Sequence, residues 1–521
     1  MLLPLCLFFA QTFDVVLTGG RIVDGTGNPW YRADVGISGD RITAIGDLRS
    51  AQAKQRVDVS GLVVAPGFID IHSHTARNLA ENPNLENVVR QGITFVIDGQ
   101  DGGSPLPLRA AMEKVAESKA VVNFGWFVGH GSIRTMAMGL VNRKATAEEL
   151  QRMKDLARAA MLDGAFGLST GLFYVPGNYA PTEEVIEIAR VVGQLGGMHI
   201  SHMRDEAAGV LDSVRETIRI GEEAGLPTQV THHKIIGAAS WGKSAETLRL
   251  IEDARQRGVD VSVDQYPYTA SHTGSSALFP QWSLEGGSKS LLERLQAPES
   301  RARIKTEVAR RIREDRGGGD PKNVQFNRCG FDPSLNGKTL ADATALRGLA
   351  VTIDNAAEVA LDIQHKGGCS TIYHAISESD VERILKYPGT MVASDGDAPQ
   401  FGSGSPHPRS YGTFPRILAR YVREKKLLTL EDAIRRMTSL PAARLKATDR
   451  GLLQAGMYAD IVIFDPELIA DRAEYAKPHQ YAVGVRDVLV NGEFIVRAGN
   501  MTGTRTGRVV LGPAREKSTT N

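Results

Sequence analysis

The sequence predicts an α/β fold, a (β/α)8 TIM barrel joined to a small β-sandwich that is built from both chain ends. The middle of the chain alternates buried strands with amphipathic helices, whereas both ends carry short alternating strands with glycine-rich turns. The chain has 521 residues, of which 42% are hydrophobic and 23% are charged, so it is long enough for one large domain and a smaller one.

Both chain ends have the pattern of antiparallel β structure. Residues 13–63 form short alternating stretches such as DVVLTGGRIVDG, separated by turns that contain glycine. The same pattern returns towards the C-terminus in ADIVIFDPEL and VRDVLVNGEFIVRAGN. We therefore expect the β-sandwich at 12–65 and 446–513, the barrel at 66–445 and a tail at 514–521.

The middle of the chain contains eight predicted strands, each followed by a helical or loop stretch. Helices such as ATAEELQRMKDLARAAMLDG have apolar residues at helical spacing and close with glycine. The predicted strands end in PGFIDIHSH, VIDGQD, NFGWFVGHG, AFGLSTG, GMHISHM, PTQVTHHK, DVSVDQYPY and MVASDG. The alternation of strands and helices is lost over about 278–365, which we interpret as an excursion from the barrel. The stretch STIYHAIS at 370–377 is a ninth candidate strand, which has no assigned position among the eight barrel strands.

Two histidines end the first predicted barrel strand, in VAPGFIDIHSHT at 64–75. Side chains alternate along a strand, so His72 and His74 project from one face and Ser73 from the other. Two neutral imidazoles that converge at a strand end can chelate zinc. The alternative is that two polar residues simply end a strand, but further ligand types at later strand ends favour the metal.

Later strand ends supply the remaining ligand types. They are Asp101, His202, His232 and Asp395. In a TIM barrel the carboxyl ends of all strands face one site, so these residues are expected to converge on His72 and His74. Imidazoles and carboxylates together suit a hydrolytic metal site with a base beside it. His233 would point to the opposite face from His232, and we interpret it as structural.

The charge balance and the cysteine spacing indicate which partners and which cysteine-based sites are not expected. Lys and Arg number 61 against 60 for Asp and Glu, and the chain has no basic run for phosphates, so nucleic acid is not an expected partner. Cys6, Cys329 and Cys369 show no CxxC spacing, so we expect neither a disulfide framework nor a thiolate zinc finger.

The first residues, MLLPLCLFFA, resemble the core of a signal peptide or its remnant at 1–11, and they are too short to span a bilayer. This slightly favours a periplasmic or secreted location over a cytoplasmic one. No later segment reaches the length of a membrane helix, so no membrane span is expected.

Motifs over nearly the whole chain carry a resemblance to a known family. They are GGRIVDGTG at 19–27, PGFIDIHSH at 66–74, GLSTGL at 167–172, HMRDE at 202–206, THHK at 231–234, YPY at 266–268, SDG at 394–396 and HPRSYGTFPR at 407–416. The sequence resembles the D-aminoacylase (N-acyl-D-amino-acid deacylase) family of the amidohydrolase superfamily. The His-x-His segment specifies only the superfamily, whereas the HMRDE, SDG and HPR-x-x-GTF group is far more specific.

The resemblance implies roles for the candidate residues. It makes His202 and His232 ligands of a tightly held metal, with His72 and His74 at a weaker second position. Asp395 matches the catalytic aspartate. Where some members have a cysteine after the second strand, this sequence has Asp101, a harder anionic ligand. This difference leaves the identity and the number of the metal ions open. Zinc is the first expectation.

Two cations are candidates for binding substrate. Arg409 resembles the family's carboxylate clamp, since a guanidinium can grip a carboxylate with two parallel hydrogen bonds. Lys234 lies two residues beyond His232 and shares its face, which makes it a second candidate. The alternative for each is an ordinary salt bridge.

The function implied by the resemblance is zinc-dependent hydrolysis of an N-acyl-D-amino acid to a carboxylate and a D-amino acid. Metal-activated water would be the nucleophile, and Asp395 the general base and acid. The alternatives are a related amidohydrolase acting on dipeptides or cyclic amides, and an inactive binding homologue. The strand AFGLSTG contains no lysine, which argues against sites bridged by a carbamylated lysine.

Overall fold

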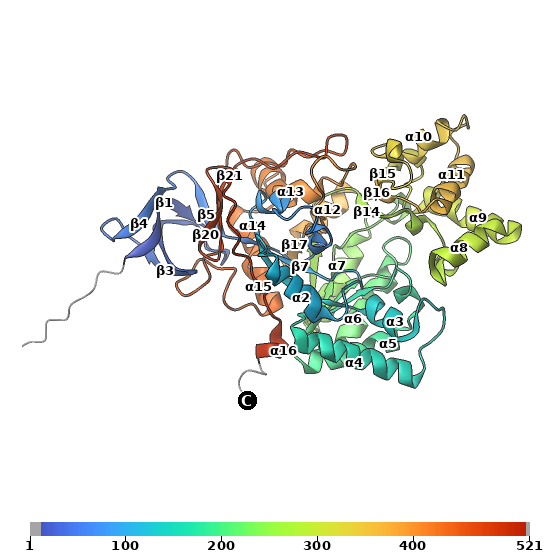
Figure 1. The fold of residues 1–521 in the computed structure, drawn as a ribbon, viewed down its shortest axis with the longest axis horizontal. Coiled ribbons are helices and arrows are strands. Elements are labelled where there is room, and N and C mark those ends of the chain that lie inside the picture. Colours follow the sequence, from blue (N-terminus) through green and yellow to red (C-terminus); the bar gives the residue numbers. More distant parts are fainter. Residues whose placement is uncertain (1–11, 517–521) are drawn as a thin grey trace, which may run out of the picture.

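The fold has three parts, a sheet domain, a barrel and an insertion on the barrel (Figure 1). The structure is a computed structural model, and it describes residues 12–516. The possible signal segment at 1–11 lies outside the described residues. Within them, no helix is both long and apolar enough to cross a bilayer.

The small β domain joins the two chain ends in one hydrogen-bonded sheet, as the sequence predicts. Its strand order is β21-β20-β19-β18-β5-β1-β2-β3, with β4 on β1. The strands are β1 Phe13–Ile22, β2 Tyr31–Ser38, β3 Arg41–Gly46, β4 Ala53–Asp58, β5 Val63–Pro66, β18 Ile461–Phe464, β19 Val485–Val490, β20 Glu493–Arg497 and β21 Asn500–Met501. The two ends meet where β18 pairs antiparallel with β5, Ile461 opposite Pro66.

The predicted TIM barrel is confirmed, with eight strand positions. They are β6 Phe68–Asp70, β7 Ile93–Asp98, β8 Asn123–Trp126 continued by β9 Val128–Gly129, β10 Gly167–Gly171, β11 Met198–His202, β12 Thr228–Val230, β13 Val261–Gln265 and β17 Thr390–Val392. The barrel closes between the last and first strands, where the Asp395 N–H donates to the His72 carbonyl at 2.9 Å and the His74 N–H donates to Gly396 at 2.9 Å.

Helices surround the barrel and cover the insertion. They are α1 Glu86–Val89, α2 Leu108–Glu117, α3 His130–Met138, α4 Ala147–Asp163, α5 Thr182–Gln194, α6 Val210–Ala224, α7 Ser244–Gln256, α8 Gly287–Gln296, α9 Pro298–Glu314, α10 Leu340–Ala345, α11 Ile353–His365, α12 Glu378–Lys386, α13 Arg409–Arg416, α14 Leu430–Met437, α15 Ser439–Leu445 and α16 Pro513–Glu516. Local sequence sets the bounds of α4, because Thr146 and Glu149 form a capping box and Gly164 ends the helix.

The insertion between β13 and β17 has its own small sheet and core. Strands β14 Ser271–Gly274, β16 Ser370–Tyr373 and β15 Val324–Arg328 pair antiparallel in that order, and α8 to α11 pack against them. The ninth candidate strand is therefore β16, outside the barrel. The insertion is longer than the predicted excursion at 278–365. Strand β14 precedes that range and strand β16 follows it, and the two strands pair with each other in the small sheet.

We expected no disulfide framework from the cysteine spacing, and that expectation missed one bond, which joins Cys329 and Cys369. These cysteines are 40 residues apart in sequence, and spacing alone gives no sign of their pairing. Arg328 and Ser370 are opposite each other in the β15–β16 ladder, so the next residue on one strand faces the preceding residue on the other. The bond joins the end of β15 to the start of β16, and α10 and α11 lie between these two strands in the sequence.

Replacing Cys329 with Ser should lower the free energy of unfolding of the insertion by about 2–4 kcal/mol, the cost expected for opening a loop of this length. Urea unfolding of wild type and variant, each with and without reductant, measures the difference. Reductant should destabilise the wild type and leave Cys329→Ser unchanged. A wild type whose unfolding ignores reductant would show that the bond contributes nothing.

Candidate metal centre

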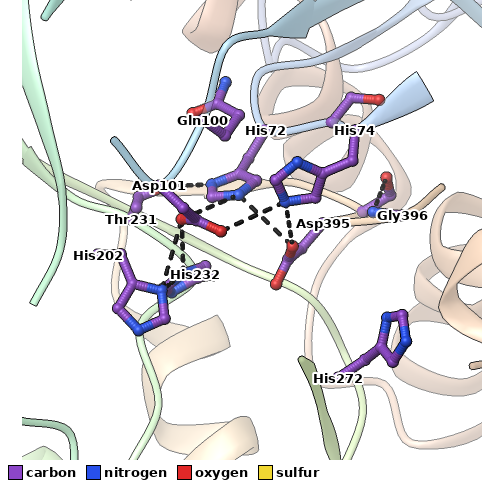
Figure 2. Close-up of polar contacts among 12 residues, drawn as sticks. His72, His74, Gln100, Asp101, His202, Thr231, His232, His272, Asp395 and Gly396 are labelled. Carbon is purple, nitrogen blue, oxygen red and sulfur yellow. Dashed lines mark hydrogen bonds and ion pairs between the residues drawn. The ribbon is translucent and has the colours of Figure 1, made fainter. Parts of the chain in front are cut away.

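Six side chains from five strand ends of the barrel meet at one point (Figure 2). His72 and His74 follow β6, Asp101 follows β7, His202 ends β11, His232 follows β12 and Asp395 follows β17. The structure thus brings together all the residues that the sequence proposed as metal ligands, together with the proposed base.

The Asp101 carboxylate lies at the centre of the group and contacts all four imidazoles. Its Oδ1 is 3.5 Å from His72 Nε2, 3.4 Å from His202 Nδ1 and 3.2 Å from His232 Nε2, and its Oδ2 is 3.3 Å from His74 Nε2. This carboxylate therefore belongs to two candidate ligand sets, and it is the group that would bridge two ions.

The two sets share Asp101, and only one of them contains a second carboxylate. The first combines His72, His74, Asp101 and Asp395, with Asp395 Oδ1 3.5 Å from His72 Nε2 and 3.2 Å from His74 Nε2. The second combines Asp101, His202 and His232. In each set the ligand atoms lie within 4.8 Å of one another.

Three of these residues adopt a backbone conformation that non-glycine residues seldom use. Asp101, His232 and Asp395 have φ angles of 55°, 36° and 51°. Such residues persist where the surrounding structure holds them, and they cluster at functional sites. At Asp101 the close packing needs a glycine opposite, because a Cβ on Gly171 would lie 2.0 Å from the Asp101 carbonyl oxygen.

Electrostatics favour the charge states that metal ligands need at Asp101, Asp395 and His232. Burial opposes ionisation of Asp101, but facing His72 and His232 outweigh it and hold the pKa of its carboxyl well below its usual range. Burial likewise opposes ionisation of Asp395, but Arg409 together with His72 and His74 outweighs it, so the pKa of this carboxyl is also well below its usual range. Burial and the Lys234 ammonium lower the pKa of His232 to about 4, which keeps this imidazole neutral. At His74 burial is outweighed by the Asp101 and Asp395 carboxylates, which raise its pKa to about 9, so this imidazole must lose a proton when a metal binds.

The donor set fits a bound metal. His72 Nε2 is buried, points into the group and has no hydrogen-bond partner there. His202 Nδ1 and His232 Nε2 face each other at 2.8 Å, an arrangement suited to two lone pairs aimed at a cation. Imidazoles with carboxylates are the ligands of hydrolytic zinc sites, and carboxylates also suit harder divalent ions.

Glu206 supports the ligands from behind, and the sequence reasoning did not single it out. Its carboxylate is buried, 3.5 Å from His232 Nδ1 and 3.7 Å from His202 Nε2. Outer carboxylates of this kind orient ligating histidines. Its place in the HMRDE motif, four residues after His202, was the available signal. His72 is positioned by a hydrogen bond of 2.7 Å between its Nδ1 and Thr231 Oγ1.

The two candidate substrate cations lie in different surroundings. Arg409 lines a cavity of about 500 Å³ over the metal ligands and donates from Nη1 to Asp395 Oδ2 at 2.8 Å. Lys234 is buried and bonds Glu206, His232 Nδ1 at 2.8 Å and the His232 carbonyl at 3.1 Å. His233 points away from the centre and contacts Thr247 Oγ1 at 2.7 Å.

Comparison with known proteins identifies the family. A family model of amidohydrolases matches residues 55–496. The chain belongs to the amidohydrolase family. It is 38% identical to the D-aminoacylase of Alcaligenes xylosoxydans xylosoxydans over 96% of this chain and 98% of that protein. It is also 37% identical to the N-acyl-D-glutamate deacylase of the same organism, over 92% of this chain and 93% of the relative.

A solved amidohydrolase structure shows the same architecture. It is an N-acyl-D-glutamate deacylase from Bordetella bronchiseptica complexed with zinc and a phosphonate inhibitor that mimics the tetrahedral intermediate of its reaction. The identity is 36% and the TM-score 0.82, over 96% of this chain and all of that chain. The likeness extends over the sheet domain, the barrel and the insertion of this amidohydrolase.

Glu206→Gln should weaken metal binding of this amidohydrolase about 10- to 100-fold, because it removes the buried negative charge that faces the far side of both His202 and His232. Metal titration of the apoprotein with a competing chelator measures the change. Glu246→Gln, at an exposed position on α7, serves as the matched control. Equal metal affinity in the two variants would contradict the supporting role.

Proposed function

We propose that this amidohydrolase is a metal-dependent deacylase that hydrolyses N-acyl-D-amino acids to a carboxylate and a free D-amino acid. One observation carries the proposal, which is that two ligand sets sharing Asp101 lie beside a buried guanidinium, Arg409, paired with Asp395. The relatives named above, a D-aminoacylase and an N-acyl-D-glutamate deacylase, support the same reaction class.

Arg409 is the proposed clamp for the substrate α-carboxylate. Its side chain is only 2% exposed and faces the cavity over the metal ligands. Of its five N–H groups, one on Nη1 donates to Asp395 at 2.8 Å and one on Nη2 donates to the His272 carbonyl at 3.5 Å, while Nε is buried without a partner. A carboxylate in the cavity would be the acceptor for the N–H groups that these two bonds leave over, and a guanidinium can give it two parallel hydrogen bonds.

Lys234 remains a second proposed substrate contact. Because its ammonium bonds Glu206 and His232, reaching a substrate would require it to exchange one of these hydrogen bonds.

Asp395 is the proposed proton carrier. A metal held by the centre supplies a polarised carbonyl and a water nucleophile at neutral pH. The Asp395 carboxylate is ionised and lies among the ligands, so it is placed to accept a proton from the attacking water and return it to the leaving amine. Arg409 holds this carboxylate in place through its second oxygen.

Zinc is the proposed ion, supported by the zinc complex of the related deacylase. We assign the tighter position to Asp101, His202 and His232, since Glu206 supports both of these histidines from behind. The weaker position belongs to His72, His74 and Asp395, where Asp395 also interacts with Arg409. The Cys329–Cys369 disulfide supports an oxidising compartment, periplasmic or secreted.

A substrate panel tests the function. We expect amine release from N-acetyl-D-amino acids in the presence of zinc, little from the L-enantiomers, and far less from N-acetyl-D-amino acid amides, which lack the carboxylate that Arg409 would bind. The panel should include D-leucine, D-glutamate and D-aspartate derivatives, a dipeptide and a cyclic amide. Preference for the dipeptide or the cyclic amide would replace the proposal with one of these related activities.

Asp395→Asn should lower turnover about 100- to 10,000-fold, because an amide keeps the size of the side chain but cannot accept the proton. The variant should still bind zinc and an unreactive phosphonate analogue of the substrate. Turnover, metal content and analogue affinity measure the three properties separately. Loss of zinc in this variant would make Asp395 chiefly a ligand, and near-normal turnover would exclude it as the base.

A further inference from the structure

We propose that a second hollow beside the metal centre binds the acyl chain of the substrate, and that this chain is a linear aliphatic group longer than acetyl. The inference rests on the proposed function, because it concerns the other half of the same substrate. We name this hollow the acyl groove. Besides Asp101 and five glycines, it is lined by Ser104, Leu106, Ser132, Thr135, Met136, Leu140, Tyr174, Val175 and Pro176.

The acyl groove adjoins the metal ligands. It has a volume of about 500 Å³ and shares Asp101 and Tyr174 with the cavity that contains Arg409. The Tyr174 ring lies 4.6 Å from the His202 ring, and its hydroxyl contacts Thr273 of the insertion at 3.1 Å. Tyr174 therefore stands between the two hollows, directly beside the centre.

The groove presents apolar side chains that the folded protein leaves partly exposed. Leu106, Leu140 and Val175 are partly exposed there, and Met136 on α3 is 41% exposed. Apart from Asp101, no charged side chain lines the groove within the described residues. Partly exposed apolar groups gathered at one hollow are typical of a surface that binds an apolar ligand.

The polar groups of the acyl groove are already engaged by backbone. Ser132 Oγ accepts from the Ser104 N–H at 2.9 Å, and Ser104 Oγ accepts from the Gly129 N–H at 2.9 Å. Thr135 Oγ1 donates to the Gly131 carbonyl at 2.7 Å. The Thr135 donor is therefore used and each serine oxygen accepts a backbone N–H, so the two serine O–H groups are the polar contacts that these side chains still offer, beside the hydrocarbon of Leu106, Met136, Leu140 and Val175.

The cavity on the other side of Tyr174 has the opposite character. It is lined by Arg409 and by further charged residues, among them Arg77, Glu81, Arg328 and Asp397. In an N-acyl amino acid the amide carbonyl separates a charged amino-acid half from the acyl half. If Arg409 binds the carboxylate in the polar cavity, the carbonyl lies over the metal ligands and the acyl chain extends into the acyl groove.

A chain-length series tests this inference, with N-acetyl-, N-hexanoyl- and N-octanoyl-D-alanine as substrates of the zinc-loaded enzyme. We expect kcat/KM to rise about three- to fourfold per methylene until the groove is filled. Alanine keeps the amino-acid half small and constant, so differences within the series report on the acyl half alone.

Met136→Gln places an amide in the groove while keeping side-chain length and helix propensity. It should lower the ratio of octanoyl to acetyl kcat/KM about tenfold, because the amide is desolvated without a partner. Leu162→Gln, at a position 46% exposed on α4 and outside the groove, is the matched control and should leave the ratio unchanged. Calorimetric binding of N-octanoyl- and N-acetyl-D-alanine to Asp395→Asn protein, with and without Met136→Gln, should show the same preference without turnover.

A flat chain-length series with intact acetyl turnover would overturn the acyl groove and leave the proposed function standing. The same ratio in Met136→Gln and Leu162→Gln would also overturn it. Absence of zinc-dependent turnover and of binding for every N-acyl-D-alanine would overturn the proposed function, and this inference with it.

Discussion

The contact of one carboxylate with four imidazoles is the interaction on which the rest of the centre depends. Asp101 lies 3.2–3.5 Å from His72, His74, His202 and His232, so its charge offsets the cost of gathering two ligand sets in a buried place. Keeping it there requires a left-handed backbone and a glycine opposite, at Gly171. The local strain at this strand end is thus part of what makes a shared anion possible.

Around this carboxylate the barrel arranges two further layers of charge. Behind the ligands, Glu206 and Lys234 pair with each other and with the far side of His232. In front of them, Arg409 pairs with Asp395 and faces the polar cavity. In the proposed function the outer layer would orient the ligands and the front layer would recognise substrate charge, so one buried network would link metal affinity to substrate binding.

Much of the fold and site could be predicted from sequence, for reasons that are local or topological. Side-chain alternation placed His72 and His74 on one face, and the convergence of barrel strand ends brought in Asp101, His202, His232 and Asp395. Contacts between distant residues outside the barrel strand ends were not predictable in this way. The Cys329–Cys369 bond and strand β16 depend on partners far away in sequence. The shared role of Asp101 likewise depends on a backbone angle that no residue pattern specifies.

The union of both chain ends in one sheet also sets the order in which this protein can be completed. Strand β5 pairs with β18, and about 400 residues of barrel and insertion separate them. At a synthesis rate of about 5–20 residues per second, β5 waits roughly 20–80 s for its partner, with one edge open. Exposed strand edges invite pairing with other chains. The N-terminal strands therefore keep one edge of their sheet unpaired until the last part of the chain has been made.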